Sequence, residues 1–221
     1  MDKTQLGHVT NVTRGSLHPL WSHVIHGADE LDPYLESVVS CYKRVFAGPP
    51  YFEDYAGQEE SYVKPSFRRF ADRGILVLFL TADDPRTGPV IGFGGSEPAD
   101  ECEDAVFLAA RQSLLETPLH RYLYMAELGV ETEFRRQGLG RELVIRRIEE
   151  ARNGRTRHFT HVIMRTAQDG SNSRRLYERL GAQVVDGLVL YKDGFKTASS
   201  ARVFLTMSMD ARLRPERLRQ G

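Results

Sequence analysis

The stretch EFRRQGLGRE at residues 133–142, called here the glycine turn, sets basic side chains around two glycines, Gly138 and Gly140. The aromatic and apolar segment before it, residues 122–130 (YLYMAELGV), is typical of a strand. Apolar residues behind it recur at helical spacing and predict a helix that begins near Gly138: Leu143, Val144, Ile148 and Ala151. Such a turn presents free backbone N–H groups and the positive end of a helix dipole. We therefore predict that the glycine turn holds a pyrophosphate.

The stretch does not match two other well-known glycine-rich phosphate-binding motifs. The dinucleotide-binding fingerprint needs a third glycine and an acidic residue about twenty positions later, and neither is in the right place. No GxxxxGK[ST] string occurs in the sequence, so a P-loop is excluded. Taken alone, the stretch also fits a solvated turn whose arginines bind nothing.

The spacing Arg135-x-x-Gly138-x-Gly140 resembles the [RQ]xxGx[GA] acyl-CoA-binding signature of the GNAT acetyltransferase superfamily. Residues 161–166 (HVIMRT) are typical of the next strand, and residues 171–182 (SNSRRLYERLGA) resemble the family's N-x4-Y-x3-G segment. Two matching segments in the right order are more specific than either one alone. The resemblance covers residues 122–185.

The resemblance implies an α/β (α+β) fold in which helices flank both faces of a mixed central sheet of six to seven strands. It also implies acetyl-CoA as cosubstrate and no metal. Gly129 independently fits a bulge or a close backbone approach, because glycine is unfavourable inside a strand. The residues that the resemblance assigns to acetyl-CoA are Leu128, Gly129, Val130, Arg135, Arg136, Gln137, Gly138, Leu139, Gly140, Arg141, Thr166 and Asn172. Asn172 is also expected to cap its helix.

The resemblance makes Tyr177 the candidate general acid, since it matches the family tyrosine that faces the CoA sulfur. The alternative is a tyrosine of the core with a locally bonded hydroxyl. Glu127 is the candidate base, or else it orients the acceptor or pairs with Arg121 or Arg165. Two histidines, His23 and His120, are alternative bases with better intrinsic pKa values, but no motif positions them.

The acceptor side is expected in the loop between the first two helices, where aromatic and acidic residues cluster: Tyr51, Phe52, Glu53, Asp54 and Tyr55. Aromatic rings with carboxylates suit a cationic, partly apolar amine. A second acidic cluster, residues 97–104, follows the predicted third strand. Its members between Asp100 and Asp104 are interpreted as solvated surface.

The predicted elements follow the family order β-α-α-β-β-β-α-β-α-β-β. A strand at 21–26 precedes a helix that Asp32 caps and residues 48–50 end, and a second helix runs from Lys64 to Gly74. The remaining predicted elements are strands at 75–80 and 90–95 joined by a turn at 83–88, an insertion at 97–120 that is helical around 105–115, and a closing hairpin of 184–191 and 201–209.

Composition limits the class of protein. With 221 residues and 41% hydrophobic content, the chain suits one domain at 20–210, with a mobile arm at 1–19 and a tail at 211–221. Lys plus Arg and Asp plus Glu both total 30, which argues against nucleic acid or an anionic membrane as partner. The two cysteines, Cys41 and Cys102, suggest neither a disulfide framework nor a metal site. We expect a cytoplasmic protein, and a homodimer stays open.

These observations predict an N-acetyltransferase that moves an acetyl group from acetyl-CoA directly to an amine in a ternary complex. No cysteine lies in a motif suited to a covalent intermediate. The expected acceptor is a primary amine on a small metabolite, amino acid or antibiotic. The alternatives are a protein N-terminus or lysine as acceptor, and a noncatalytic acyl-CoA sensor.

Overall fold

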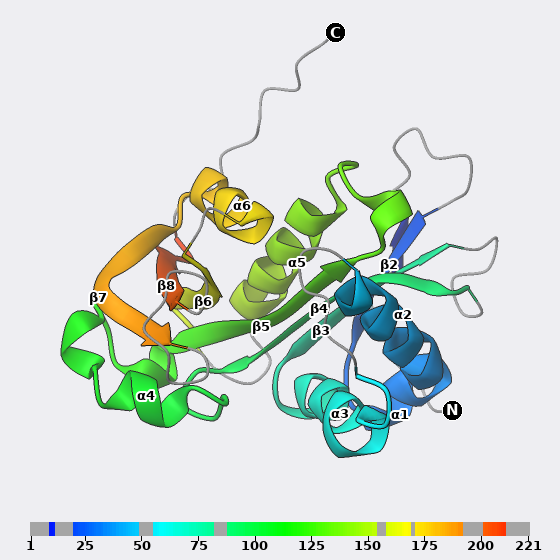
Figure 1. The fold of residues 1–221 in the computed structure, drawn as a ribbon, viewed down its shortest axis with the longest axis horizontal. Coiled ribbons are helices and arrows are strands. Elements are labelled where there is room, and N and C mark those ends of the chain that lie inside the picture. The colour runs from blue at the N-terminus through cyan, green and yellow to red at the C-terminus, as the bar shows by residue number, and fades with distance from the viewer. Residues whose placement is uncertain are drawn as a thin grey trace, which may run out of the picture. The chain divides into compact units, whose positions relative to one another are not determined.

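The structure is a computed structural model that describes residues 9–11, 20–48, 55–81, 88–153, 158–168, 171–191 and 201–210. The chain forms two compact units (Figure 1). The first unit comprises Met1–Glu97 with Ala126–Glu150, and the second comprises Pro98–Met125 with Ala151–Gly221. Strand β5 (Tyr122–Val130) contributes residues to both.

The first unit contains an antiparallel meander of four strands: β1 (Val9–Asn11), β2 (Leu20–Ile25), β3 (Ile75–Thr81) and β4 (Val90–Pro98). The end of β5 lies beside the start of β4, because the Glu131 N–H donates to the Ile91 carbonyl at 2.9 Å. The strand order in this unit is therefore β1-β2-β3-β4-β5. The strands predicted at 21–26, 75–80 and 90–95 are confirmed.

The helices of the first unit are α1 (Ala28–Leu31), α2 (Leu35–Ala47), α3 (Lys64–Arg73) and α5 (Leu139–Asn153), which extends past the unit boundary. The large apolar side chains of α2 recur at helical spacing, and all of them are buried: Leu35, Val38, Val39, Tyr42, Val45 and Phe46. A turn of π-helix at Glu59–Val63 leads into α3, which ends at Gly74 as predicted.

The prediction that Asp32 caps the first helix is wrong. The chain is already helical in α1, and Asp32–Tyr34 forms a 3-10 turn that joins α1 to α2. The Asp32 side chain makes no capping hydrogen bond and instead faces Arg68 at 3.6 Å. Pro33 is tolerated in this turn because proline suits a first helical position, where no N–H is required.

Two successive glycines show that helices pack on both faces of β4. Neighbouring residues of a strand point to opposite faces. A side chain at Gly94 would meet the Arg147 guanidinium of α5, whereas one at Gly95 would meet the Phe70 ring of α3 at 2.3 Å. Residues without a Cβ therefore let both helices approach the sheet closely. The fold class predicted from the sequence, a mixed sheet with helices on both faces, is confirmed.

The second unit has the strand order β5-β6-β8-β7. Its part of β5 pairs in parallel with β6 (His161–Ala167), which pairs antiparallel with β8 (Ala201–Ser208), and β8 pairs antiparallel with β7 (Gln183–Tyr191). Helix α6 (Asn172–Leu180) and the short helix α4 (Ala105–Ala109) belong to this unit. The predicted closing hairpin of β7 and β8 is confirmed.

Two regions differ from the expectations. Within the expected unstructured arm at 1–19, residues 9–11 form β1, a strand too short to show a period in the sequence. The helix expected around 105–115 is shorter: it ends at Ala109, and a 3-10 turn follows at Gln112–Leu114. The predicted turn at 83–88 lies largely outside the described residues, as does the tail at 211–221. Within the described part of the chain, no helix has the length and hydropathy to cross a membrane.

Candidate active site

The glycine turn follows the end of β5 and bends the backbone through the left-handed region twice. Arg136 has φ of 65°, the only positive value at a non-glycine position among the described residues, and Gly138 has φ of 85°. Alternation of left-handed and right-handed residues turns successive N–H groups toward one side, which makes an anion-binding nest. A non-glycine residue in this region costs of order 1 kcal/mol, and such strain is typical of functional sites.

Helix α5 begins directly at this bend, as predicted. The Glu142 N–H donates to the Gly138 carbonyl at 3.0 Å, which is the first bond of the helical ladder. The N–H groups of the first helical turn, which starts at Leu139, have no acceptor within the helix and carry the positive end of its dipole. Gly138 is exposed, and nothing lies within 4 Å of where its Cβ would be. The backbone at Gly138 is therefore accessible from solvent.

Arg135 has a second role that its motif position did not reveal. Its Nε donates to the Val130 carbonyl at 2.8 Å and so fastens the glycine turn to the last residue of β5. Arg136 and Gln137 are exposed, and the Gln137 amide reaches back to the Glu133 carbonyl. The start of the turn is thus anchored to β5 through Arg135, and its tip carries exposed polar side chains.

Strand β5 carries the next group of predicted residues. Its parallel pairing with β6 ends at Met125 with Met164, whereas β5 itself continues to Val130. The predicted close approach at Gly129 is confirmed, because a Cβ there would lie 2.3 Å from the Phe93 ring. Leu128 and Val130 lie in the part of β5 beyond the parallel ladder with β6.

Glu127 points its carboxylate at helix α2. The Tyr42 hydroxyl donates to the Glu127 Oε1 at 3.4 Å, and both groups belong to the first unit. Burial and the negative charge of Glu127 raise the pKa of Tyr42 well above its usual range, so the hydroxyl keeps its proton and remains a donor. Arg165, one of the two arginines considered as a partner of Glu127, donates to Asp104 and Glu103.

Arg147 supports the same strand from the opposite helix. It is fully buried, and its Nη1 donates to the carbonyls of Gly95 (2.8 Å) and Glu127 (3.2 Å). Sequence reasoning missed it, although it falls on the apolar face of α5 between Val144 and Ile148. A charged residue at a predicted core position was the signal, because buried charges need specific partners.

In the second unit, Tyr177 lies on α6 and is only 4% exposed. The prediction that Asn172 caps this helix is wrong: Ser171 is the cap, and its Oγ accepts from the Arg174 N–H at 3.1 Å. Asn172 is exposed at the first helical position. The Thr166 hydroxyl lies within 2.7 Å of the Ser171 Oγ, so it belongs to the hydroxyl cluster that starts the helix.

The acidic cluster of residues 97–104 is solvated surface only in part: Asp100, Glu101 and Glu103 are exposed, as predicted, whereas Asp104 is not. Asp104 is buried and accepts from the Tyr124 hydroxyl at 2.7 Å and from Arg165 at 2.8 Å. Burial raises the pKa of Tyr124, which therefore remains a donor to that carboxylate. Glu97 is also buried and pairs with Arg69 of α3. These carboxylates hold structure together, because each buried charge has a cationic or hydroxyl partner.

A family model described as the acetyltransferase (GNAT) family matches residues 39–182, which is more than half of the chain. The chain belongs to the GNAT acetyltransferase family. It is therefore an acyltransferase. The matched region contains the glycine turn, Glu127 and Tyr177. No curated protein sequence matches the chain.

Solved structures with low sequence identity share this GNAT fold. Arabidopsis thaliana NAA60 in complex with acetyl-CoA is 15% identical and covers 86% of this chain and 99% of its own, with a TM-score of 0.59. The ribosomal-protein-S18-alanine N-acetyltransferase of Escherichia coli is 14% identical and covers 89% and 98%, with a TM-score of 0.52. The putative acetyltransferase yncA of Salmonella typhimurium, solved with acetyl-CoA, is 13% identical over 89% and 98%, with a TM-score of 0.52.

Tyr55 is the one predicted acceptor residue of this GNAT chain that the structure describes, since residues 51–54 lie outside the described part. Its half-buried ring packs edge-on against Tyr42, with ring centroids 5.0 Å apart. The ring of Tyr62, which is partly exposed, stacks on that of Tyr55 with centroids 6.0 Å apart. Tyr55 thus connects a buried tyrosine that contacts Glu127 to a tyrosine at the surface.

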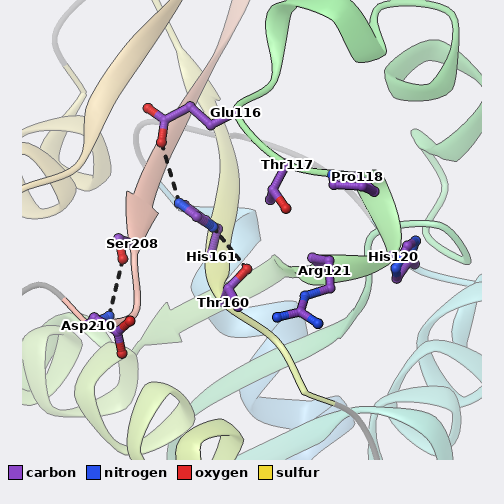
Figure 2. A pocket seen from close by; sticks show the side chains of 9 residues that line it. All are labelled: Glu116, Thr117, Pro118, His120, Arg121, Thr160, His161, Ser208 and Asp210. Atoms are coloured by element: carbon purple, nitrogen blue, oxygen red, sulfur yellow. Dashed lines mark hydrogen bonds and ion pairs between the residues drawn. The ribbon is translucent and has the colours of Figure 1, made fainter.

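A separate hollow of about 590 Å³ lies in the second unit, where β5 and β6 begin. Figure 2 shows its lining, in which His161 faces Glu116 at 3.4 Å and Arg121 points into the space. The glycine turn follows the other end of β5, so the hollow is not the predicted acetyl-CoA site of this GNAT enzyme. His120 lines the hollow and is exposed, whereas His23 is buried and bonded to Glu30.

No group of three or more metal-ligand side chains is found among the described residues of the chain. The expectation of metal-free chemistry stays a prediction that this observation does not test.

Proposed function

We propose that this protein is an N-acetyltransferase that transfers the acetyl group of acetyl-CoA to a primary amine of a small molecule by direct attack in a ternary complex. Acetyl-CoA is the cosubstrate that GNAT enzymes use. The observation that carries the proposal is the backbone of the glycine turn, with left-handed residues at Arg136 and Gly138 at the start of α5.

The acetyl-CoA side of the proposed site, called here the donor half, is built from residues of the first unit. Backbone N–H groups of the glycine turn, with the α5 dipole behind them, suit the two negative charges of a pyrophosphate. The pantetheine arm then pairs with the backbone of Leu128 and Val130, in the part of β5 beyond its ladder with β6. Arg136 and Arg141 add positive charge around the turn.

The chemical step needs one group that removes a proton and one that supplies a proton. The ammonium of the acceptor loses one proton to Glu127, its nitrogen attacks the thioester carbonyl, and the C–S bond breaks as the tetrahedral intermediate collapses. Tyr177 donates its hydroxyl proton to the departing thiolate, which leaves as CoA–SH, and regains a proton from the nitrogen, which loses its second proton as the neutral amide forms. No covalent enzyme intermediate is required. Cys41 is buried, and burial raises the pKa of its thiol, so it is unsuited to carry the acetyl group.

A cationic small amine is the acceptor class that the described side chains favour. Glu127 offers one carboxylate, and the nearby rings of Tyr55 and Tyr62 offer aromatic surface for a cation. Cytoplasmic location belongs to the same proposal, in keeping with a reaction that uses intracellular acetyl-CoA.

A thiol-release assay with acetyl-CoA, run across an amine library and a peptide library, tests the proposal. Release of CoA–SH with small primary amines supports it, and mass spectrometry should show one acetyl group added to the amine. Release with peptides alone replaces the small-molecule acceptor with a protein N-terminus or lysine. Binding of acetyl-CoA without release in either library identifies a sensor and contradicts catalysis.

A further inference from the structure

A fully buried arginine of α5 joins the helix of the glycine turn to two strands of the first unit. The Arg147 Nη1 donates to the Gly95 carbonyl of β4 at 2.8 Å and to the Glu127 carbonyl of β5 at 3.2 Å. Its Nε donates to the Leu143 carbonyl, one turn earlier on α5, at 3.1 Å. One guanidinium therefore connects α5, β4 and β5, and all of these residues belong to the same compact unit.

The glycine next to this contact leaves the room that the guanidinium fills. A Cβ at Gly94 would lie 2.9 Å from the Arg147 Nε and 3.1 Å from its Cζ, so a larger residue there would displace the guanidinium. Glycine inside a strand is otherwise unfavourable, because it has no side chain to pack. The two elements are thus matched at this point: β4 lacks a side chain where α5 supplies a charged one.

A side chain that only filled the core would not need the charge of Arg147. Its neighbours on the buried face of α5 are apolar: Leu143, Val144 and Ile148. A buried charge is costly unless hydrogen bonds compensate for the lost water, so an apolar residue is the usual choice at such a position. The carbonyls that Arg147 bonds are what distinguish it from an apolar residue. One of them, that of Glu127, lies directly before the backbone of Leu128–Val130.

The segment Glu127–Val130 of β5 accepts an arginine hydrogen bond at each of its ends. Arg135, in the glycine turn, donates to the Val130 carbonyl at 2.8 Å. Arg147, about two turns beyond the start of α5, donates to the Glu127 carbonyl at the other end. These two connections hold the segment of β5 at a fixed separation from the start of α5.

We propose that Arg147 is a positioning residue for acetyl-CoA: it holds the backbone of Glu127–Val130 at the distance from the glycine turn that one acetyl-CoA molecule spans. The inference rests on the proposed function, in which the pyrophosphate lies at the start of α5 and the pantetheine arm pairs with β5. These two sites must keep one separation for the thioester to meet the acceptor amine. Arg147 acts through the carbonyls of Gly95 and Glu127, and no contact with acetyl-CoA is assigned to it.

The test measures the two ends of acetyl-CoA separately by calorimetric titration. One ligand is acetyl-CoA, and the other is its nucleotide half, which keeps the pyrophosphate and lacks the pantetheine arm. Arg147→Met removes the donors, Arg147→Lys keeps the charge without the planar guanidinium, and Gly94→Ala displaces the guanidinium while the arginine stays in the chain. Arg146→Met is the matched control, because Arg146 is the adjacent arginine of α5 and pairs with Glu142 instead.

Arg147→Met and Gly94→Ala should bind acetyl-CoA about tenfold more weakly, whereas their affinity for the nucleotide half should stay within about twofold of wild type. In the same variants kcat should fall about tenfold or more, because a misplaced thioester carbonyl reacts more slowly. Arg147→Lys should fall between Arg147→Met and wild type, since an ammonium can still donate to a carbonyl. Arg146→Met should match wild type in every measurement.

A purely structural role would lower the affinity for both ligands in proportion. Such equal losses, or wild-type affinity and kcat in Arg147→Met and Gly94→Ala, would overturn the inference and leave the acetyltransferase function intact. Absence of acetyl-CoA binding by the wild-type protein would overturn the proposed function and this inference together. Thermal melting shows whether each variant is folded, and if Arg147→Met unfolds, Gly94→Ala and Arg147→Lys decide by the same ratio of affinities.

Discussion

The glycine turn and the surroundings of Glu127 lie in the same unit but are built in different ways. The glycine turn consists of consecutive residues, and its chemistry comes from backbone geometry at Arg136 and Gly138. The Glu127 side is assembled from side chains, and its central contact joins Tyr42 and Glu127, which are 85 residues apart. In the proposed reaction, the donor half therefore depends on local conformation, and the acceptor half depends on tertiary packing.

Loss of the proposed acid, Tyr177, should give the largest effect on activity, and it should leave acetyl-CoA binding intact. In Tyr177→Phe we expect kcat to fall about 10²–10⁴-fold, the range typical of a positioned acid or base. Acetyl-CoA affinity should stay near that of wild type, because the glycine turn keeps its backbone. Steady-state kinetics together with calorimetric titration check both points, and an unchanged kcat across the pH range would place the acid elsewhere.

Substitution of Arg147 tests how strongly stability around Glu127 depends on buried hydrogen bonds. Its guanidinium donates to the carbonyls of Gly95 and Glu127 and is fully buried. Arg147→Met leaves those buried carbonyls without this donor, at about 1–3 kcal/mol for each unsatisfied group. Chemical denaturation should therefore show a loss of several kcal/mol.

The neighbouring Arg146 is the control for this loss. It pairs with Glu142 one turn away on α5 at 3.0 Å. Arg146→Met should cost about 0.5 kcal/mol or less, as for other helical pairs with that spacing. Equal stabilities of the two variants would contradict the role given to Arg147.

Alanine substitution at two glycines should cause similar backbone strain but affect different halves of the proposed reaction. Gly138 (φ 85°) and Gly57 (φ 79°) both have left-handed backbone and open space where a Cβ would be. Substitution by alanine should cost each position about 1–2 kcal/mol of local strain. Gly138→Ala should weaken acetyl-CoA binding about tenfold, whereas Gly57→Ala, beside Tyr55, should leave it unchanged and raise the KM for the amine. Weakened acetyl-CoA binding in both variants would remove the distinction.

The smallest effect concerns alkaline pH. Burial, together with the charge of Glu127, raises the folded-state pKa of Tyr42 above its ordinary value of 10. Because the pKa of Tyr42 is higher in the folded state, its protonation contributes fully to the free energy of unfolding below pH 10. Above pH 10 that contribution is lost, by up to about 1.4 kcal/mol for each pH unit. The stability of Tyr42→Phe should therefore fall less steeply above pH 10 than that of wild type, as measured by urea denaturation. Parallel curves would show that Tyr42 does not titrate differently in the folded state.

The sequence predicted what local spacing controls. The turn from β5 into α5, the glycine at 129 and the buried face of α2 all follow from residues close together in the chain. The hydrogen bond from Tyr42 to Glu127 was not predictable, because apolar periodicity places Tyr42 in the core without showing which way its hydroxyl points.

Two predictions were wrong because residue type alone does not show the partners of a side chain. Asp104 looked like a solvated acid in an acidic run, but Tyr124 and Arg165 from two strands enclose it. Asn172 occupies the motif position, yet Ser171 caps α6, because the helix begins at Asn172, one residue earlier than a cap at Asn172 would place it. Neither error could be corrected from the sequence, since both depend on where the backbone of a neighbouring element lies.

Calorimetric titration with acetyl-CoA and with acetyl-pantetheine, which lacks the pyrophosphate, tests the central claim most directly. If the glycine turn holds the pyrophosphate, wild type binds acetyl-CoA at one site and binds acetyl-pantetheine at least about 100-fold more weakly, a difference of about 2.7 kcal/mol. In Gly138→Ala this preference should shrink. Equal affinity for the two ligands, or no binding of acetyl-CoA, would contradict the assignment of the glycine turn.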